Sequence, residues 1–109
     1  MEEKRVTVEF ENEKLKRSYE ALPQTSHFKK QIDKAIKQIK EVPGYGQPIS
    51  HKLIPKEYKT KGFDNVFYVR LNKEWRLVYS LIGNGKIDIL AIILEWFDSH
   101  KGYERRFKY

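Results

Sequence analysis

Two arginines in neighbouring segments, and a histidine and a tyrosine near the C-terminus, are the side chains best suited to chemistry. Arg70 and Arg76 lie on either side of a short polar stretch, and His100 and Tyr103 lie in the tail DSHKGYERRFKY. Arginine binds a phosphate through parallel N–H donors, histidine exchanges a proton near neutral pH, and tyrosine donates a hydrogen bond. Further basic residues of the tail that could hold a backbone phosphate are Arg105, Arg106 and Lys108. The pattern predicts a site that binds a phosphate and moves a proton.

The two arginines are predicted to face each other across a β-hairpin. If a three-residue loop at 72–74 joins the two strands, Arg70 lies opposite Arg76 in the ladder. Two like charges in this arrangement repel each other, so we expect a carboxylate or a phosphate between them.

An internal carboxylate is one candidate for that shared anion. The dipeptide Asn84-Gly85 is preferred in two-residue hairpin turns, and such a turn would pair Arg76 with Ile93. Glu95 would then lie on the same face and could reach both arginines. Two interpretations stay open: an Arg–Glu–Arg cluster with a purely structural role, and a phosphate-binding site.

No metal centre or cofactor is predicted. The chain has no cysteine, and His27, His51 and His100 show none of the i, i+4 spacing of a helical metal site. A glycine-rich phosphate loop and a nucleophile elbow are also missing from the sequence.

Composition and charge limit the class of protein and of partner. With 109 residues, of which 39% are hydrophobic, the chain is predicted to form a single domain over residues 1–109. Its net charge of +7 favours a polyanionic partner, either nucleic acid or an acidic protein, although solubility would also explain it. The charged N-terminus, the absence of cysteine and the lack of a long apolar run predict a cytoplasmic protein outside the membrane.

Periodicity predicts a strand followed by two helices. Residues 6–10 alternate with a period of two, as in a half-buried strand. Apolar residues at helical spacing predict one helix between Asn12 and Pro23, and a second between Ser26 and Pro43. The second helix has a lysine face of the kind that usually points to solvent: Lys30, Lys34, Lys37 and Lys40.

A long connection at 44–65, containing one short strand, leads to three antiparallel strands at 66–71, 75–82 and 87–94. The last is apolar on both faces and is predicted to lie inside the sheet. The predicted fold class is α+β, with two N-terminal helices packed on one face of a four- to five-stranded, mainly antiparallel sheet.

This order of elements, with VFYVRLNKEWRLVYSL before an apolar strand and a short tail, resembles the RelE/ParE superfamily of toxin-antitoxin toxins over nearly the whole chain. The specific part is Arg-Leu followed by Trp-Arg-Leu-Val-Tyr, which is similar to the RelE pattern of a basic residue on one strand and YRLVY on the next. On this match Arg70 and Arg76 stand at functional basic positions. The ending His100-Lys-Gly-Tyr103 is similar to the His-x-x-Tyr ending of HigB-type members.

The resemblance implies a ribosome-dependent mRNA endonuclease that needs no metal and is paired with an acidic antitoxin protein. It implies that Arg76 stabilises the developing charge, Arg70 positions the phosphate, and Tyr103 transfers a proton or stacks on a base. His100 or Glu95 would act as the base. The remaining residues assigned to RNA binding are Lys73, Arg105 and Arg106.

The sequence departs from RelE in two places. Tyr68 stands where RelE has a second basic residue, and an acidic and aromatic stretch, residues 95–98, stands where RelE is strongly basic. Two alternatives therefore stay open. One is a ParE-like inhibitor of DNA gyrase, and the other is a non-catalytic module, either an orphan of the toxin fold or a basic RNA-binding domain.

Overall fold

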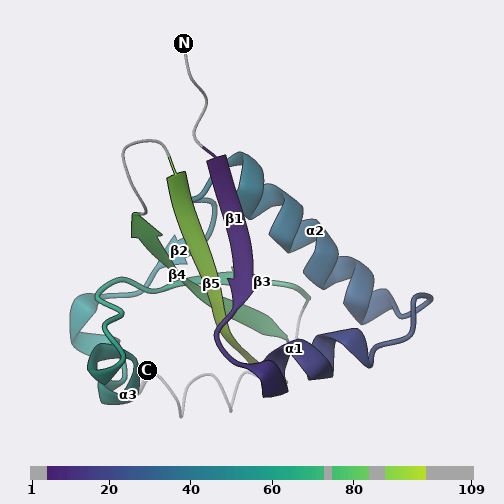
Figure 1. The fold of residues 1–109 in the computed structure, drawn as a ribbon, viewed down its shortest axis with the longest axis horizontal. Helices are drawn as coiled ribbons and strands as arrows, with labels where there is room; N and C mark the ends of the chain where they lie inside the picture. Colours follow the sequence, from purple (N-terminus) through teal and green to yellow (C-terminus); the bar gives the residue numbers. More distant parts are fainter. Residues whose placement is uncertain (1–4, 73–74, 84–87, 98–109) are drawn as a thin grey trace.

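The computed structural model describes residues 5–72, 75–83 and 88–97 and contains one five-stranded sheet in the order β1-β5-β4-β3-β2 (Figure 1). The strand bounds are β1 Arg5–Phe10, β2 Gln47–Pro48, β3 Phe67–Arg70, β4 Arg76–Gly83 and β5 Asp88–Phe97. β1 pairs with β5 in parallel, and the other three pairs of strands are antiparallel. The predicted fold class is confirmed, including the position of the last strand inside the sheet.

The two N-terminal helices begin where the sequence predicts. α1, Glu13–Glu20, is capped by Asn12, whose Oδ1 accepts a hydrogen bond of 2.8 Å from the Leu15 backbone N–H. α2, His27–Glu41, is capped by Ser26, whose Oγ accepts from the Lys29 N–H at 3.2 Å. Such caps satisfy amide donors that the first turn of a helix leaves free.

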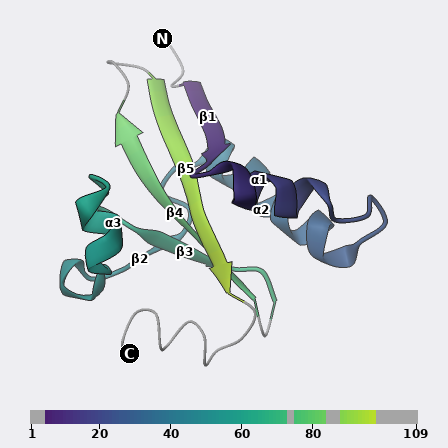
Figure 2. The same ribbon diagram turned by 60° about the horizontal axis from the view of Figure 1, so that its bottom comes forward.

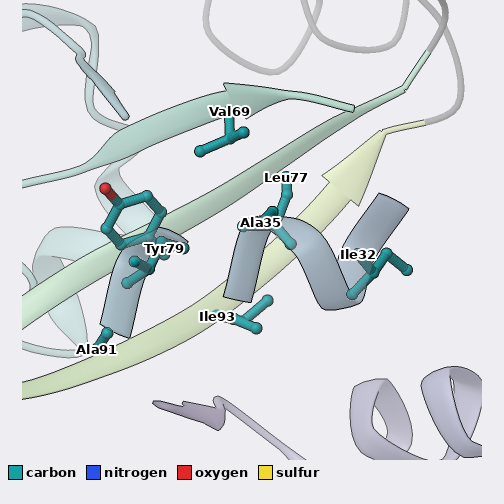
Figure 3. Close-up of a cluster of buried hydrophobic side chains, with 8 residues drawn as sticks. Ile32, Ala35, Val69, Leu77, Tyr79, Ala91 and Ile93 are labelled. Carbon is teal, nitrogen blue, oxygen red and sulfur yellow. The ribbon is translucent and has the colours of Figure 1, made fainter. Parts of the chain in front are cut away.

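α2 packs its apolar stripe against one face of the sheet. Ile32, Ala35 and Ile39 are buried, and β4 and β5 contribute Leu77 and Ile93 to the same cluster. Figure 3 shows α2 lying across the strands, with Ala35 of the helix close to Leu77 and Ile93 of the strands. We call this side of the sheet the helix face.

The opposite side of the sheet is covered in part by the connection between α2 and β3. The connection contains β2, the 3₁₀ turn His51–Leu53 and α3, Lys56–Thr60. A second apolar cluster forms beneath it: Ile49, Ile54, Tyr58, Phe63, Val66 and Val78. Figure 2 shows α3 on one side of the sheet and α1 and α2 on the other. The short strand was predicted, whereas the helical turns were not; we call this side the α3 face.

The register between β4 and β5 differs from the predicted one. Arg76 lies opposite Phe97 rather than Ile93, and the pair nearest the connection is Gly83 with Ile89. The predicted turn dipeptide at 84–85 lies outside the described residues. A two-residue turn centred on it would pair Gly83 with the residue at 86, whereas Gly83 pairs with Ile89, so the predicted register is wrong.

Packing of β5 against α2 explains this register. Tyr79 pairs with Ile93 and Leu81 pairs with Ala91, which brings all four side chains to the helix face. Because side chains alternate, an odd shift in pairing would move one strand's set to the wrong face. An irregularity between Val78 and Tyr79 then shifts the pairing along the remainder of β4.

Candidate functional site

The predicted opposition of the two arginines is present in the ladder. Arg70 of β3 lies directly opposite Arg76 of β4. Beyond them, the backbone N–H of Leu71 donates to the Trp75 carbonyl at 2.9 Å and extends the pairing to the end of the hairpin. The two guanidinium-bearing residues therefore occupy one cross-strand pair.

The arginine pair lies on the α3 face. Arg76 precedes Leu77, which belongs to the helix-face cluster, and is two residues before Val78, which belongs to the α3-face cluster. Alternation along a strand places Arg76 on the side of Val78. Arg76 therefore does not point into the core beneath α2.

The two arginines differ sharply in exposure. The side chain of Arg76 is 5% exposed, whereas Arg70 is exposed. A guanidinium stays protonated in proteins, and a charge held away from water acts more strongly on a nearby ion than one in solvent. Arg76 is thus the stronger electrostatic group of the pair, and Arg70 the more accessible one.

The hairpin end that carries the arginines is anchored to α2. Asn72 Nδ2 donates to Gln31 Oε1 at 2.8 Å, and Asn72 Oδ1 accepts from the Trp75 backbone N–H at 2.9 Å. The ring of Trp75 lies 4.4 Å, centroid to centroid, from that of Phe28. These contacts fix the hairpin relative to the helix and so position the two strand ends on which the arginines lie.

The other predicted site residues divide into two groups. The backbone of Glu95 pairs with Val78, two residues along β4 from Arg76. Outside the described residues lie His100, Tyr103, Lys73, Arg105 and Arg106. The arginine pair is therefore observed, and the convergence of the tail on it stays a prediction.

Tyr45 is a surface residue next to Arg70 that the sequence analysis did not single out. Its side chain is 44% exposed. Tyr45 and Arg70 line two adjacent hollows, one of about 380 Å³ against α2 and one of about 340 Å³ against β2. The signal in the sequence is a tyrosine between two glycines, GYG, directly after Pro43. An aromatic side chain in a tight connection is a candidate for binding a ligand.

Tyr79 holds the loop that carries Tyr45. The Tyr79 hydroxyl donates to the Pro43 carbonyl at 2.8 Å and accepts from the Gly46 N–H at 2.8 Å. Burial raises the pKa of Tyr79, so the phenol keeps the proton that it donates. A Cβ added at Gly46 would lie 2.8 Å from the Tyr68 carbonyl oxygen, which explains the glycine there.

Within the described residues, no group of three histidine, aspartate or glutamate side chains is placed to hold a metal ion. No helix among the same residues is both long enough and apolar enough to cross a membrane.

No protein-family model matches the sequence, and no curated protein sequence matches it significantly. A solved structure does match: a YoeB/ParE toxin from Agrobacterium tumefaciens, with a TM-score of 0.56 and 18% sequence identity. The match covers 88% of this chain and 99% of that one. The fold is that of the RelE/ParE toxins.

In this RelE/ParE-type fold, the arginine pair occupies the sheet face that α1 and α2 leave free. Two cations, the buried Arg76 and the exposed Arg70, therefore lie on a face where α3 covers only part of the strands.

Proposed function

We propose that the chain is a single RelE/ParE-like toxin domain, residues 1–109, of a type II toxin-antitoxin system, and that it cleaves mRNA on the ribosome. The opposed pair of Arg70 and Arg76 on the α3 face is the observation that carries the proposal. Two facing cations in one cross-strand pair match the two negative charges of the phosphorane through which RNA cleavage passes, and arginine binds phosphate groups through parallel N–H donors.

The reaction is an attack by the RNA's own 2′-hydroxyl on the adjacent phosphorus. An O–P bond forms, the bond to the 5′-oxygen breaks, and the products carry a 2′,3′-cyclic phosphate and a 5′-hydroxyl. One proton leaves the 2′-hydroxyl and another goes to the 5′-oxygen. The chemistry needs orientation, two proton transfers and stabilisation of a doubly charged phosphorane, and it needs no metal.

The roles follow from burial and from side-chain chemistry. Arg76, in its nearly dry position, stabilises the charge that develops on the phosphate. Arg70 is exposed and holds the strand by its phosphate. His100 or Glu95 takes the proton from the 2′-hydroxyl, and Tyr103 donates a proton or stacks on a base; Lys73, Arg105 and Arg106 bind the backbone.

An acidic antitoxin is the expected protein partner. A chain with a net charge of +7 attracts an acidic segment over long range. Binding of such a segment across the arginine pair would block RNA from the same surface.

The second candidate is a gyrase inhibitor. The matching Agrobacterium tumefaciens toxin is named for ParE as well as for YoeB, and the shared fold does not separate the two activities. The two candidates make opposite predictions for one pair of assays.

The decisive assay incubates the protein with ribosomes programmed with a defined mRNA and maps the RNA ends. We expect cleavage that persists in a chelator and leaves 2′,3′-cyclic or 3′-phosphate ends. Intact mRNA together with inhibition of DNA supercoiling by gyrase would replace this proposal by the ParE-like one. If neither activity is found, the chain is a binding module.

A further inference from the structure

A groove lies between α2 and the edge of β3, next to the arginine pair. Its α2 wall carries Lys30 and Lys34, its floor includes Ala35 and Val69, and Tyr45 and Arg70 also line it. We call it the α2–β3 groove. Its volume of about 380 Å³ is in the range of small-molecule sites.

The charge of the groove has one sign. Three of its lining residues are cations, Lys30, Lys34 and Arg70, and none is acidic. The two lysines are four residues apart on α2 and so share one face of the helix. Lys37 and Lys40 are exposed on the same helix, but neither lines the groove. The lysine face predicted from the sequence is thus divided into a groove side and a solvent side.

Tyr45 gives the groove an aromatic side chain on a loop that is held in place. The Tyr45 N–H donates to the Val42 carbonyl at 2.9 Å, and Tyr79 binds the loop on both sides of Tyr45 through Pro43 and Gly46. A loop whose backbone is already held loses little freedom when a flat ligand stacks on the side chain that it carries.

Arg70 connects the groove to the second hollow. It lines both, and the hollow against β2 is also lined by Tyr45 and Tyr68. The two hollows together therefore present two lysines, an arginine and two tyrosines, with Tyr45 and Arg70 common to both. Cations and aromatic rings on one surface are typical of proteins that bind single-stranded nucleic acid.

We propose that the α2–β3 groove is a second binding site for single-stranded RNA, next to the arginine pair and sharing Arg70 with it. Lys30 and Lys34 hold backbone phosphates, a base stacks on Tyr45, and Arg70 is shared with the cleavage site. The strand thus passes around the edge of β3. This site goes beyond the proposed cleavage and does not require it.

An acidic peptide is the rival occupant. β2 pairs only with Phe67 and Tyr68, so an extended segment could add to β3 beyond them. The aromatic side chain of Tyr45 favours RNA, since bases stack on tyrosine and acidic side chains do not.

The test measures binding of a fluorescein-labelled octauridylate with 2′-O-methyl riboses, which cannot undergo attack by a 2′-hydroxyl. Fluorescence anisotropy is recorded against salt concentration. The double variant Lys30→Ala/Lys34→Ala should weaken binding and reduce the slope of log K against log salt by about 1.4, for two lost phosphate contacts. The matched control, Lys37→Ala/Lys40→Ala, removes the same charge from the same helix and should leave the slope nearly unchanged. Equal losses in the two double variants would overturn the proposal.

Tyr45 separates a nucleic-acid site from a general anion site. Tyr45→Ala should weaken octauridylate binding on the order of tenfold and leave binding of inorganic polyphosphate unchanged, whereas Tyr45→Phe should keep both. If Tyr45→Ala leaves binding of the oligonucleotide unchanged, the proposal is overturned. If binding of a hexaglutamate peptide depends on Lys30 and Lys34, and binding of the oligonucleotide does not, the groove binds a protein partner instead. The oligonucleotide cannot be cleaved, so its binding tests the groove independently of catalysis. If it binds through the groove while ribosomal mRNA stays uncut, the proposed cleavage is rejected and the RNA-binding groove is kept.

Discussion

The helix face and the α3 face of the sheet use adjacent residues of the same strands for different purposes. On the helix face, Leu77 and Tyr79 are fully buried beneath α2 in an apolar cluster that extends across β3, β4 and β5. On the α3 face, Val78 is equally buried, but Arg76 of the arginine pair lies two residues before it in β4. One face is thus closed by helices, and the other combines a smaller core with charge. Alternation in β4 allows both, because neighbouring residues never share a face.

The largest expected effect is on catalysis and concerns the charged part of the α3 face. Arg76→Ala should lower turnover on ribosome-bound mRNA on the order of 100- to 1000-fold, with RNA binding largely kept, because the lost charge acts mainly in the transition state. Arg70→Ala should instead weaken RNA binding and flatten its salt dependence, because this exposed residue loses a phosphate contact. Turnover and binding are measured for both variants on the same mRNA.

The opposite pattern, with Arg76→Ala failing only in binding, would assign both arginines to positioning. If both variants cleave as the wild type does, the arginine pair has a structural role, which is the other interpretation that the sequence left open.

Stability should separate the two cores. Leu77→Ala should lower the free energy of unfolding by about 2–5 kcal/mol, because it leaves a cavity beneath α2. Val78→Ala removes fewer carbon atoms from the smaller α3-face cluster and should cost about 2 kcal/mol. Urea unfolding of both variants provides the comparison. A larger loss for Val78→Ala would show that the α3 face holds more of the stability than its size suggests.

Two glycines in the loop beside the groove make a matched pair. Gly46→Ala would bring a Cβ to 2.8 Å from the Tyr68 carbonyl oxygen and 2.9 Å from Tyr79 Cε1, so it should cost about 1–3 kcal/mol. At Gly44 a Cβ meets nothing within 4 Å, and Gly44→Ala should change stability by less than about 1 kcal/mol. Thermal unfolding measures both, and similar losses would mean that the loop moves to admit the methyl group.

The smallest expected effect is on thermal stability, and it appears only at alkaline pH. Burial, helped by a hydrogen bond to Asp33, raises the pKa of Tyr19 from 10.0 to about 12. Because the pKa of Tyr19 is higher in the folded protein than in the unfolded chain, its contribution to the free energy of unfolding is complete below about pH 10. This contribution is lost as the pH rises to about 12. Tyr19→Phe should therefore reduce the fall of the melting temperature between these values. Asp33→Asn should reduce it less, since burial is the larger cause. No difference among the three proteins would place the alkaline transition elsewhere.

Local patterns predicted much of the fold. The caps at Asn12 and Ser26 and the period of two in β1 depend only on neighbouring residues, and all are present. The opposition of Arg70 and Arg76 was also predictable, because the short link between β3 and β4 leaves few possible registers.

Tertiary packing decided what the sequence did not predict. The register of β5 depends on Ala91 and Ile93 reaching α2, which outweighs the turn preference of a dipeptide. α3 spans only five residues, too few to show a helical period, and it forms where Tyr58 can be buried. The loop that carries Tyr45 is held by the Tyr79 hydroxyl through Pro43 and Gly46, residues far from Tyr79 in the chain.

The parallel pairing of β1 with β5 has a consequence for the timing of folding. Arg5 of β1 lies opposite Asp88 of β5, so β1 cannot pair with its neighbour until β5 has been synthesised. β4 can pair with β3 earlier, but its other edge stays without a neighbouring strand until β5 pairs with it. Closing so long a loop is slow, and during synthesis β5 leaves the ribosome last. A ribosome making this protein has therefore translated nearly all of these strands before the sheet that carries the arginine pair can close.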